Sequence, residues 1–173
     1  MTTSQVAPPG GEPPQDFATW YRSELPRVCR ALALATGDVG LGEEAAAEAF
    51  ARALASWDRV GRMASPGAWV YTVALNEARR TWRRSRLERR YLERQRLEDV
   101  PAPSAPDDTL WRAVAALPPR ARTAVALRYV ADLPEAEIAD VMNVHRGTVA
   151  ATLSTARRQL AATLGPALNG EPR

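Results

Sequence analysis

The sequence predicts an all-α fold of two small helical domains joined by a flexible linker. Apolar residues recur at three- and four-residue steps along most of the 173 residues, and no stretch alternates as a strand would. Much of the 46% hydrophobic content is alanine and leucine, which favours helix. A proline-rich, acidic stretch without apolar periodicity divides the chain. The expected divisions are a disordered tail at 1–15, domains at 16–95 and 107–165, the linker at 96–106 and a second tail at 166–173.

The first domain begins with two predicted helices. The first runs from Asp16 to about Thr36, and Pro26 could interrupt it. Glycines at 37 and 40 end it, and the second runs from Leu41 to Trp57, with Leu54 beside its apolar stripe. The acidic residues of its first turns lie where the helix dipole is positive.

The third helix of this domain combines a sharp start with a strongly basic second half. Residues 58–64 read as an irregular loop, after which Ser65 caps the helix and Pro66 fits its first position. The pattern then continues to about Leu97 without a breaker. Residues 79–96 hold nine arginines and two glutamates, a local net charge of +7. Acidic partners at four-residue steps are few, so the helix does not neutralise itself.

Aromatic residues lie on or beside this basic stretch, at Trp69, Tyr71 and Trp82. Arginine contacts phosphates and aromatic rings stack on unpaired bases, so the combination favours single-stranded nucleic acid. Two plainer interpretations stay open: the arginines can form a solvated helix face, and Trp69 can belong to the core.

The second domain is predicted to contain four short helices. The first holds Leu110, Val114 and Leu117 and stops at two prolines; the second holds Val125, Leu127 and Val130. Pro134 opens a third helix that runs through Met142. The fourth runs from about Arg146 to Leu164, before a Gly-Pro pair.

The last two helices have the layout of a helix-turn-helix. Ala139 permits close approach of the helices, and Asn143 lies where the turn needs a left-handed residue. Val144, Val149 and Leu153 can bury the second helix, which in such motifs lies in the DNA major groove. The alternative is an ordinary helical hairpin within a bundle.

Composition argues against several classes of protein. The chain has one cysteine, Cys29, and one histidine, His145, and it lacks zinc-ligand spacing and a glycine-rich phosphate loop. We therefore expect no metal, no cofactor and no enzymatic activity. No apolar run approaches a membrane span, and the first residues do not resemble a signal peptide, so a soluble cytoplasmic protein is expected.

Three blocks in order resemble the extracytoplasmic-function group of the sigma-70 family, the bacterial RNA polymerase initiation subunits. "GEEAAAEAFARALASW" is similar to the helix that docks on the polymerase clamp, and "SPGAWVYTVALNEARRTWRR" to the region that binds the minus-10 element. "LPPRARTAVALRYVADLPEAEIADVMNVHRGTVAATLSTARRQL" is similar to the fourth sigma domain, which reads the minus-35 element. The resemblance covers about residues 16–165.

The resemblance implies a function and a set of sites. The chain would bind core RNA polymerase through its clamp and flap, recognise a two-part promoter and help to melt it, with the loop 58–64 and the following helix capturing minus-10 bases. An anti-sigma partner stays open, and the free chain is expected to be a monomer. The implied minus-10 residues are Trp69, Tyr71, Asn76, Arg79, Arg80 and Arg83. The implied minus-35 residues are His145, Arg146, Thr148, Arg157 and Arg158. The implied clamp-docking residues are Glu43, Glu44, Ala47 and Glu48.

The sequence departs from the family pattern on two helices. Glu44 and Ala47 stand where the clamp-docking helix usually has Asp and Gln. Ala150, Thr152 and Thr155 stand where the recognition helix usually has basic residues. Two other functions remain as alternatives: a stand-alone helix-turn-helix regulator, and a sigma-like protein–protein adaptor.

Overall fold

The computed structural model describes residues 16–92 and 109–165, and every regular element in these two ranges is a helix. This confirms the all-α fold class. The predicted linker and both predicted tails lie outside the described residues. The elements are α1 Phe17–Thr36, α2 Val39–Ala55, α3 Trp57–Val60, α4 Pro66–Leu92, α5 Thr109–Ala115, α6 Pro119–Val125, the π-helical turn η1 Ala126–Val130, α7 Glu135–Met142 and α8 Arg146–Leu164.

Helix α1 is continuous through Pro26, so the expected interruption is wrong. Asp16 caps the helix by accepting a hydrogen bond from the Thr19 backbone N–H (3.0 Å). Pro26 is exposed, whereas Trp20 before it and Val28 after it are buried in the same core. Packing on both sides of the proline therefore keeps the two halves in one helix despite the lost hydrogen bond.

A seam of small residues brings α1 and α2 close together. Gly42 and the alanines at 45, 46, 49 and 53 of α2 are buried. A Cβ atom at Gly42 would lie 2.7 Å from the backbone nitrogen of Ala33 on α1, closer than real Cβ contacts. The seam thus requires glycine at residue 42 and fixes which face of α2 points outward.

The segment between α2 and α4 is more ordered than expected. Helix α2 ends at Ala55, and a short helix α3 occupies part of the segment predicted as an irregular loop. Val60 of α3 is fully buried. Trp57 packs on Trp20, with ring centroids 4.7 Å apart, and on Phe17 at 5.1 Å. These contacts, which join residues far apart in sequence, give the segment its helical turn.

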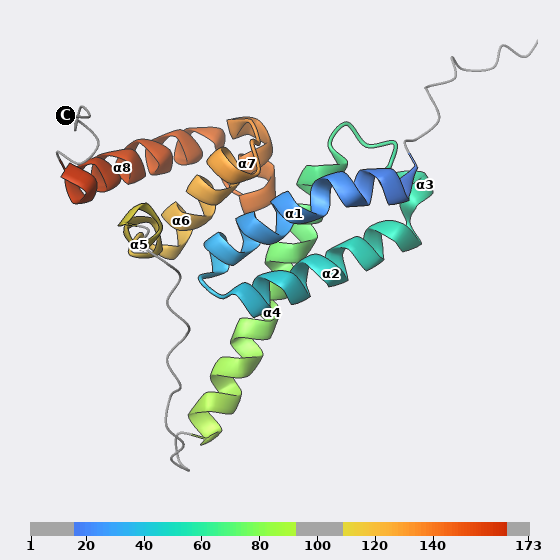
Figure 1. Ribbon diagram of the computed structural model, residues 1–173, viewed down its shortest axis with the longest axis horizontal. Helices are drawn as coiled ribbons and strands as arrows, with labels where there is room; N and C mark the ends of the chain where they lie inside the picture. Colours follow the sequence, from blue (N-terminus) through green and yellow to red (C-terminus); the bar gives the residue numbers. More distant parts are fainter. Residues whose placement is uncertain (1–15, 93–108, 166–173) are drawn as a thin grey trace, which may run out of the picture.

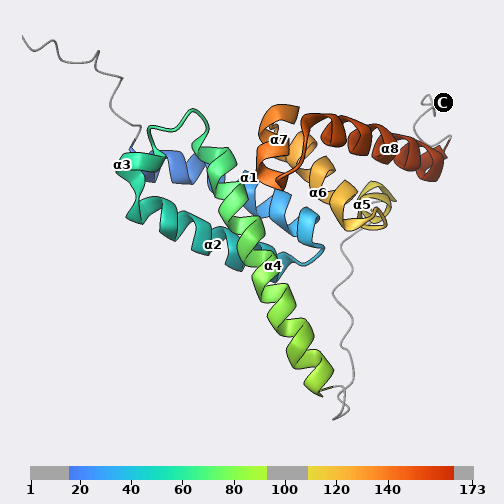
Figure 2. The same cartoon turned by 180° about the vertical axis from the view of Figure 1, so that it is seen from behind.

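Helix α4 starts as predicted and then leaves the bundle. The Ser65 hydroxyl accepts from the Ala68 backbone N–H (3.3 Å), and Pro66 is the first helical residue. The first half packs on α1 and α2 through Val70, Tyr71 and Ala74. The second half extends away from the rest of the molecule (Figure 1). Figure 2 shows the same projection from behind.

Tyr71 is 1% exposed, and its hydroxyl forms no hydrogen bond with any described residue. Burial disfavours the phenolate and raises the pKa of Tyr71 well above its ordinary value, and the nearby Glu24 carboxylate adds to this. The side chain is therefore a neutral core residue with an unsatisfied polar group.

Residues 109–165 form the predicted helical unit, and its helix-turn-helix has the expected geometry. Helix α6 runs into the π-helical turn η1, whose Leu127 is buried. Asn143 adopts the left-handed conformation (φ 53°) between α7 and α8. Ala139, Val149 and Leu153 are buried between the two helices and their neighbours.

The two predicted domains are in direct contact. Helices α6 and η1 pack on α1, α7 packs on the start of α4, and the buried side chains form one cluster. Arg122 of α6 donates from Nε to the Ala35 carbonyl and from Nη2 to the Thr36 carbonyl, both at 3.2 Å. Ser65 donates from Oγ to Glu137 Oε2 of α7 at 2.6 Å. Sequence periodicity gave no sign of this contact.

The seam makes a matched pair of glycine variants informative. Gly42→Ala is expected to lower the free energy of unfolding by about 1–3 kcal/mol, because the methyl group meets the α1 backbone. Gly40→Ala, in the same helix turn with only an ordinary contact to Asp38, is expected to be neutral or stabilising by up to about 1 kcal/mol. Urea unfolding followed by circular dichroism measures both. Equal effects of the two variants would contradict the close approach.

The unsatisfied hydroxyl predicts an unusual response to Tyr71→Phe. Removing a buried hydroxyl without a partner should leave the free energy of unfolding unchanged or raise it by about 1 kcal/mol. Tyr129→Phe, at an exposed ring, is the control and should be neutral. A loss of stability in Tyr71→Phe well beyond the control would mean that the hydroxyl has a partner after all.

Candidate nucleic-acid interface

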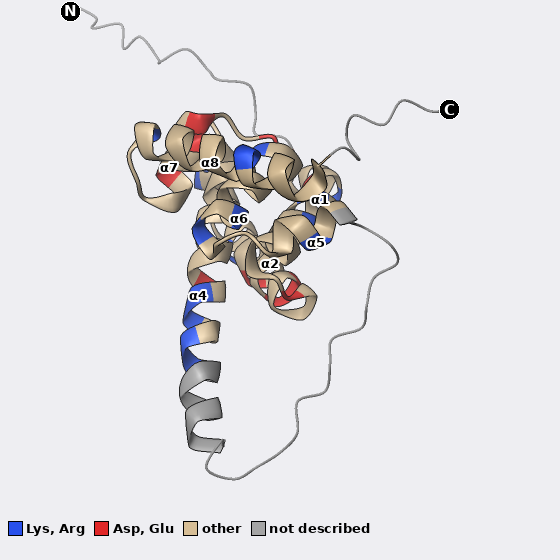
Figure 3. Ribbon diagram, turned by 90° about the vertical axis from the view of Figure 1, so that its left-hand side faces the viewer, with Lys and Arg blue, Asp and Glu red and all other residues tan. Residues whose placement is uncertain are grey.

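Arg79, Arg80 and Arg83 form a cationic surface where α4 leaves the bundle. Arg79, Arg80 and Arg83 are exposed, and none of them pairs with a described carboxylate. Figure 3 shows their basic band on α4 next to the body of the molecule. Asn76 is exposed at the start of this surface and accepts from Arg79 Nη1 (3.2 Å). The structure thus brings four of the predicted minus-10 residues together on one accessible stretch of helix.

The predicted aromatic residues are divided between surface and core. Trp82 is 52% exposed, and Trp69 is half-buried with the Arg59 guanidinium 6.0 Å from its ring centroid. Tyr71 is buried, so its expected role as a surface for bases is wrong for this arrangement. Residues 69 and 71 are two apart on a helix, which turns their side chains to different faces.

The predicted clamp-docking residues lie on the outer face of α2. Glu43, Glu44, Ala47 and Glu48 are all exposed, opposite the buried alanine seam. Glu48 pairs with Arg52 at 2.7 Å, and Arg52 also reaches Glu77 at 3.1 Å. Leu54, placed beside the core stripe by its sequence spacing, is 58% exposed instead. The face therefore combines carboxylates with an exposed apolar residue, which suits binding to another protein.

The five residues predicted to contact the minus-35 element lie on α8 or at its N-cap. His145, Arg146, Thr148, Arg157 and Arg158 are all exposed. Arg146 Nε lies 3.9 Å from Glu135 Oε2, and Arg157 Nε donates to the Leu153 carbonyl (3.3 Å). These contacts orient two of the five predicted minus-35 side chains within their own unit.

The residues that are exposed along the outer face of α8 are mostly not the residues at which the sequence departs from the family pattern. Thr148, Ala151, Thr155 and Arg158 are exposed at three- and four-residue steps, so they share one outer face. Ala150 and Thr152 are half-buried, and the Thr152 hydroxyl donates to the Thr148 carbonyl (2.7 Å). Of the three departures, only Thr155 lies on the outer face. Ala151, which also carries no basic or amide group, is exposed on the same face.

The two units that are predicted to read the DNA elements lie against each other in this arrangement. The hydrogen bond from Ser65 to Glu137 places α7 of the helix-turn-helix at the start of α4, next to the loop 61–64.

In residues 16–92 and 109–165 no group of three or more His, Cys, Asp or Glu side chains is placed to hold a metal. Among the helices of the same residues, none is long and apolar enough to cross a membrane.

Comparisons with known proteins match both halves of the chain. The model described as Sigma-70 region 2 matches residues 20–88, and the model described as Sigma-70, region 4 matches residues 107–160. No curated protein matches the chain.

Two solved structures share the fold. The sigma factor RpoE in complex with the anti-sigma factor NepR, from Bartonella quintana, matches with a TM-score of 0.73 at 20% identity, covering 87% of this chain and 97% of that one. The anti-anti-sigma factor PhyR complexed with NepR, from the same organism, matches with a TM-score of 0.51 at 18% identity, covering 87% of this chain and 52% of that one. A match over 87% of the chain must include residues of both halves.

The two family models together cover more than half of the chain, in the order found along its length. They correspond to the α1–α4 unit, hereafter region 2, and the α5–α8 unit, hereafter region 4. The chain belongs to the sigma-70 family, as an alternative sigma factor with the region 2 and region 4 arrangement of the extracytoplasmic-function group.

Proposed function

We propose that this chain binds core RNA polymerase in the cytoplasm, directs it to promoters with minus-10 and minus-35 elements, and helps to melt the DNA. The observation that supports this most is the surface of Arg79, Arg80 and Arg83 on α4, which pair with no described carboxylate, in the same chain as the exposed residues of α8. The first surface suits phosphates and unpaired bases, and the second suits the major groove. The proposed role is that of a transcription regulator acting through polymerase, with no chemistry of its own.

Each surface has its own task in this proposal. The outer face of α2 docks on the polymerase clamp through its exposed carboxylates and Leu54. Trp69, Asn76 and the arginines at 79, 80 and 83 hold the minus-10 strand, and Tyr71 supports them from the core. His145, Arg146, Thr148, Arg157 and Arg158 contact the minus-35 element while region 4 binds the polymerase flap. The short side chains Ala151 and Thr155 leave room for contact with thymine methyl groups.

The two DNA elements are too far apart for the closed arrangement to read both. Their centres are separated by 25 base pairs, or about 85 Å at 3.4 Å per base pair. In the structure α7 lies directly on the start of α4. We therefore propose that region 4 moves away from region 2 when the chain works. The 17 chain steps between Leu92 and Thr109 could span at most about 55–60 Å, so the rest of the roughly 85 Å would be covered by the dimensions of the two regions themselves.

An anti-sigma protein is a further proposed partner. RpoE, which shares this fold across both regions, was found in complex with the anti-sigma factor NepR. A protein that binds both regions at once would keep the α4 surface from DNA. We expect the free chain to be a monomer, since region 2 and region 4 bury apolar surface against each other.

The direct test is transcription with purified core polymerase on genomic fragments, with start sites mapped with and without the chain. Specific starts should appear only when the chain is present. Glu44→Arg on the outer face of α2 should weaken core binding by about tenfold, because it reverses a charge at the proposed interface. Asp140→Arg, an exposed charge reversal on α7, should leave core binding unchanged. Promoter binding by the chain alone, without any effect on polymerase, would favour the stand-alone regulator.

The α4 surface predicts a separation of promoter melting from core binding. Replacement of Arg79, Arg80 and Arg83 with alanine should strongly reduce open complexes, while affinity for core polymerase stays near that of the parent. Each lost phosphate contact should also lower the salt slope of DNA binding by about 0.7–0.9. Permanganate footprinting measures the opening. Arg112→Ala, exposed on α5, is the control. If the triple variant opened promoters as the parent does, the three arginines would be only a solvated face of the helix.

The contacts between the regions predict that the free chain can be opened by mutation. Ser65→Ala with Arg122→Ala removes three hydrogen bonds between the regions, each contributing about 1 kcal/mol, so the double variant should shift the balance between closed and open forms by roughly 150-fold. Small-angle X-ray scattering should then give a larger radius of gyration than for the parent, and binding of a single-stranded minus-10 fragment should tighten. An unchanged radius and affinity would show that these contacts do not hold the regions together.

A further inference from the structure

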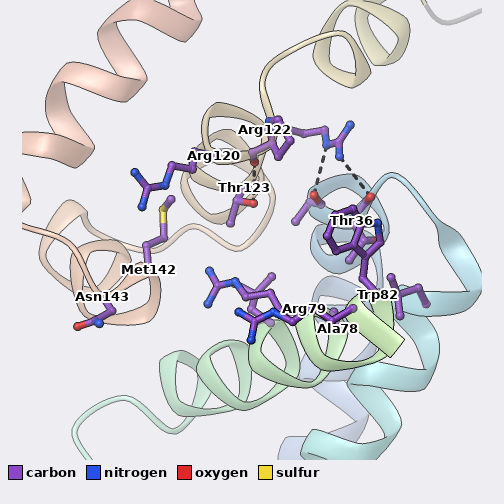
Figure 4. Close-up of a pocket in the computed structure, with 14 residues that line it drawn as sticks. Thr36, Ala78, Arg79, Trp82, Arg120, Arg122, Thr123, Met142 and Asn143 are labelled. Carbon is purple, nitrogen blue, oxygen red and sulfur yellow. Dashed lines mark hydrogen bonds between the residues drawn. The ribbon is translucent and has the colours of Figure 1, made fainter. Parts of the chain in front are cut away.

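A cleft of about 560 Å³ lies between the two regions, with walls from both. Helix α4 and the end of α1 form one side, and α6 with the end of α7 forms the other (Figure 4). Four arginines line it, Arg79 and Arg83 on α4 and Arg120 and Arg122 on α6, together with Trp82. The cleft exists only when the regions are closed on one another.

The charge of the cleft is unbalanced. Its described lining includes no Asp or Glu, and none of the four arginines pairs with a carboxylate among the residues that the structure describes. Figure 4 shows Arg79 and Arg120 extending into the opening from opposite walls, while Arg122 turns towards Thr36. Like charges that face each other across a cleft oppose its closure, so closure favours an anion between them.

We propose that this cleft binds a small phosphate-bearing polyanion, and that the bound anion holds region 4 against region 2. All 23 basic residues of the chain are arginine, since it contains no lysine, and the planar guanidinium matches phosphate oxygens with paired hydrogen bonds. The volume fits a triphosphate or a nucleotide. A small group that carries several negative charges matches four arginines in one cleft better than the single charge of a peptide carboxylate does.

Binding and closure are coupled because the arginines come from both regions. An anion that contacts α4 and α6 together binds the closed form more tightly than the open form, so it must shift the balance towards closure. Because the closed form also places α7 against the start of α4, the anion would oppose DNA binding. This proposal goes beyond the sigma activity and depends on the closed arrangement alone.

Calorimetric titration of the full chain with inorganic tripolyphosphate tests the site, with sodium chloride at matched ionic strength as the control for screening. We expect saturable binding of one tripolyphosphate per chain. In Ser65→Ala, which loses a hydrogen bond between the regions, small-angle scattering should give a smaller radius of gyration with tripolyphosphate than in chloride. Arg120→Ala should weaken binding about tenfold or more, since it removes a charged donor that has no other described partner. Arg112→Ala, exposed and outside the cleft, should bind as the parent does.

Two comparisons make the outcome decisive. A nucleoside triphosphate that binds as tightly as tripolyphosphate would assign the affinity to the phosphates alone, and a tighter one would add stacking on Trp82; either supports the site. Tripolyphosphate that acts no more strongly than chloride, or Arg120→Ala that binds like Arg112→Ala, would overturn it. Arg120→Ala should transcribe like the parent without tripolyphosphate and resist inhibition when it is added. If the parent directs no transcription even before tripolyphosphate is added, the result would instead contradict the sigma activity.

Discussion

The contact of Arg122 with the end of α1 organises the relation between the two halves of this protein. The last carbonyls of a helix have no partner within it, and Arg122 donates to two of them, at Ala35 and Thr36, while also donating to Ala115 in its own region. The cation thus caps a helix of region 2 from a helix of region 4. With α6 on α1, α7 contacts Ser65 at the start of α4, and the cleft that Arg79, Arg83, Arg120 and Arg122 line forms between α4 and α6.

A second constraint acts inside region 2. Gly42 and the alanines of α2 let its backbone approach α1, and the same helical spacing turns Glu43, Glu44, Ala47 and Glu48 outward together. The same pattern therefore sets both the close packing and the residues of the proposed docking surface. Ala47, which stands where the family usually has an amide side chain, is exposed and lies outside the seam, so this departure affects the proposed docking surface and not the fold.

Local chemistry made most of the fold and much of the site predictable from the sequence. The Ser65 cap, the left-handed Asn143 and the alternation of buried and exposed residues on α8 each depend on neighbours within a few positions. What the sequence did not predict depends on distant contacts. Pro26 stays within a helix because Trp20 and Val28 pack on one core, Trp57 orders the following turn, and Tyr71 is buried although Trp69 is not. Which of the short residues of α8 face outward also depends on distant packing, since Ala151 is exposed while Ala150 and Thr152 are half-buried.

We propose that region 4 lies closed on region 2 in the free chain and separates from it at a promoter. Energy transfer between dyes on the two regions tests this most directly. Cysteines can be placed at the exposed residues Arg30 on α1 and Ala162 on α8 in a Cys29→Ala background. We expect high transfer in the free chain and a large loss of transfer in the open complex with polymerase and promoter DNA. High transfer that persists while open complexes form would contradict it.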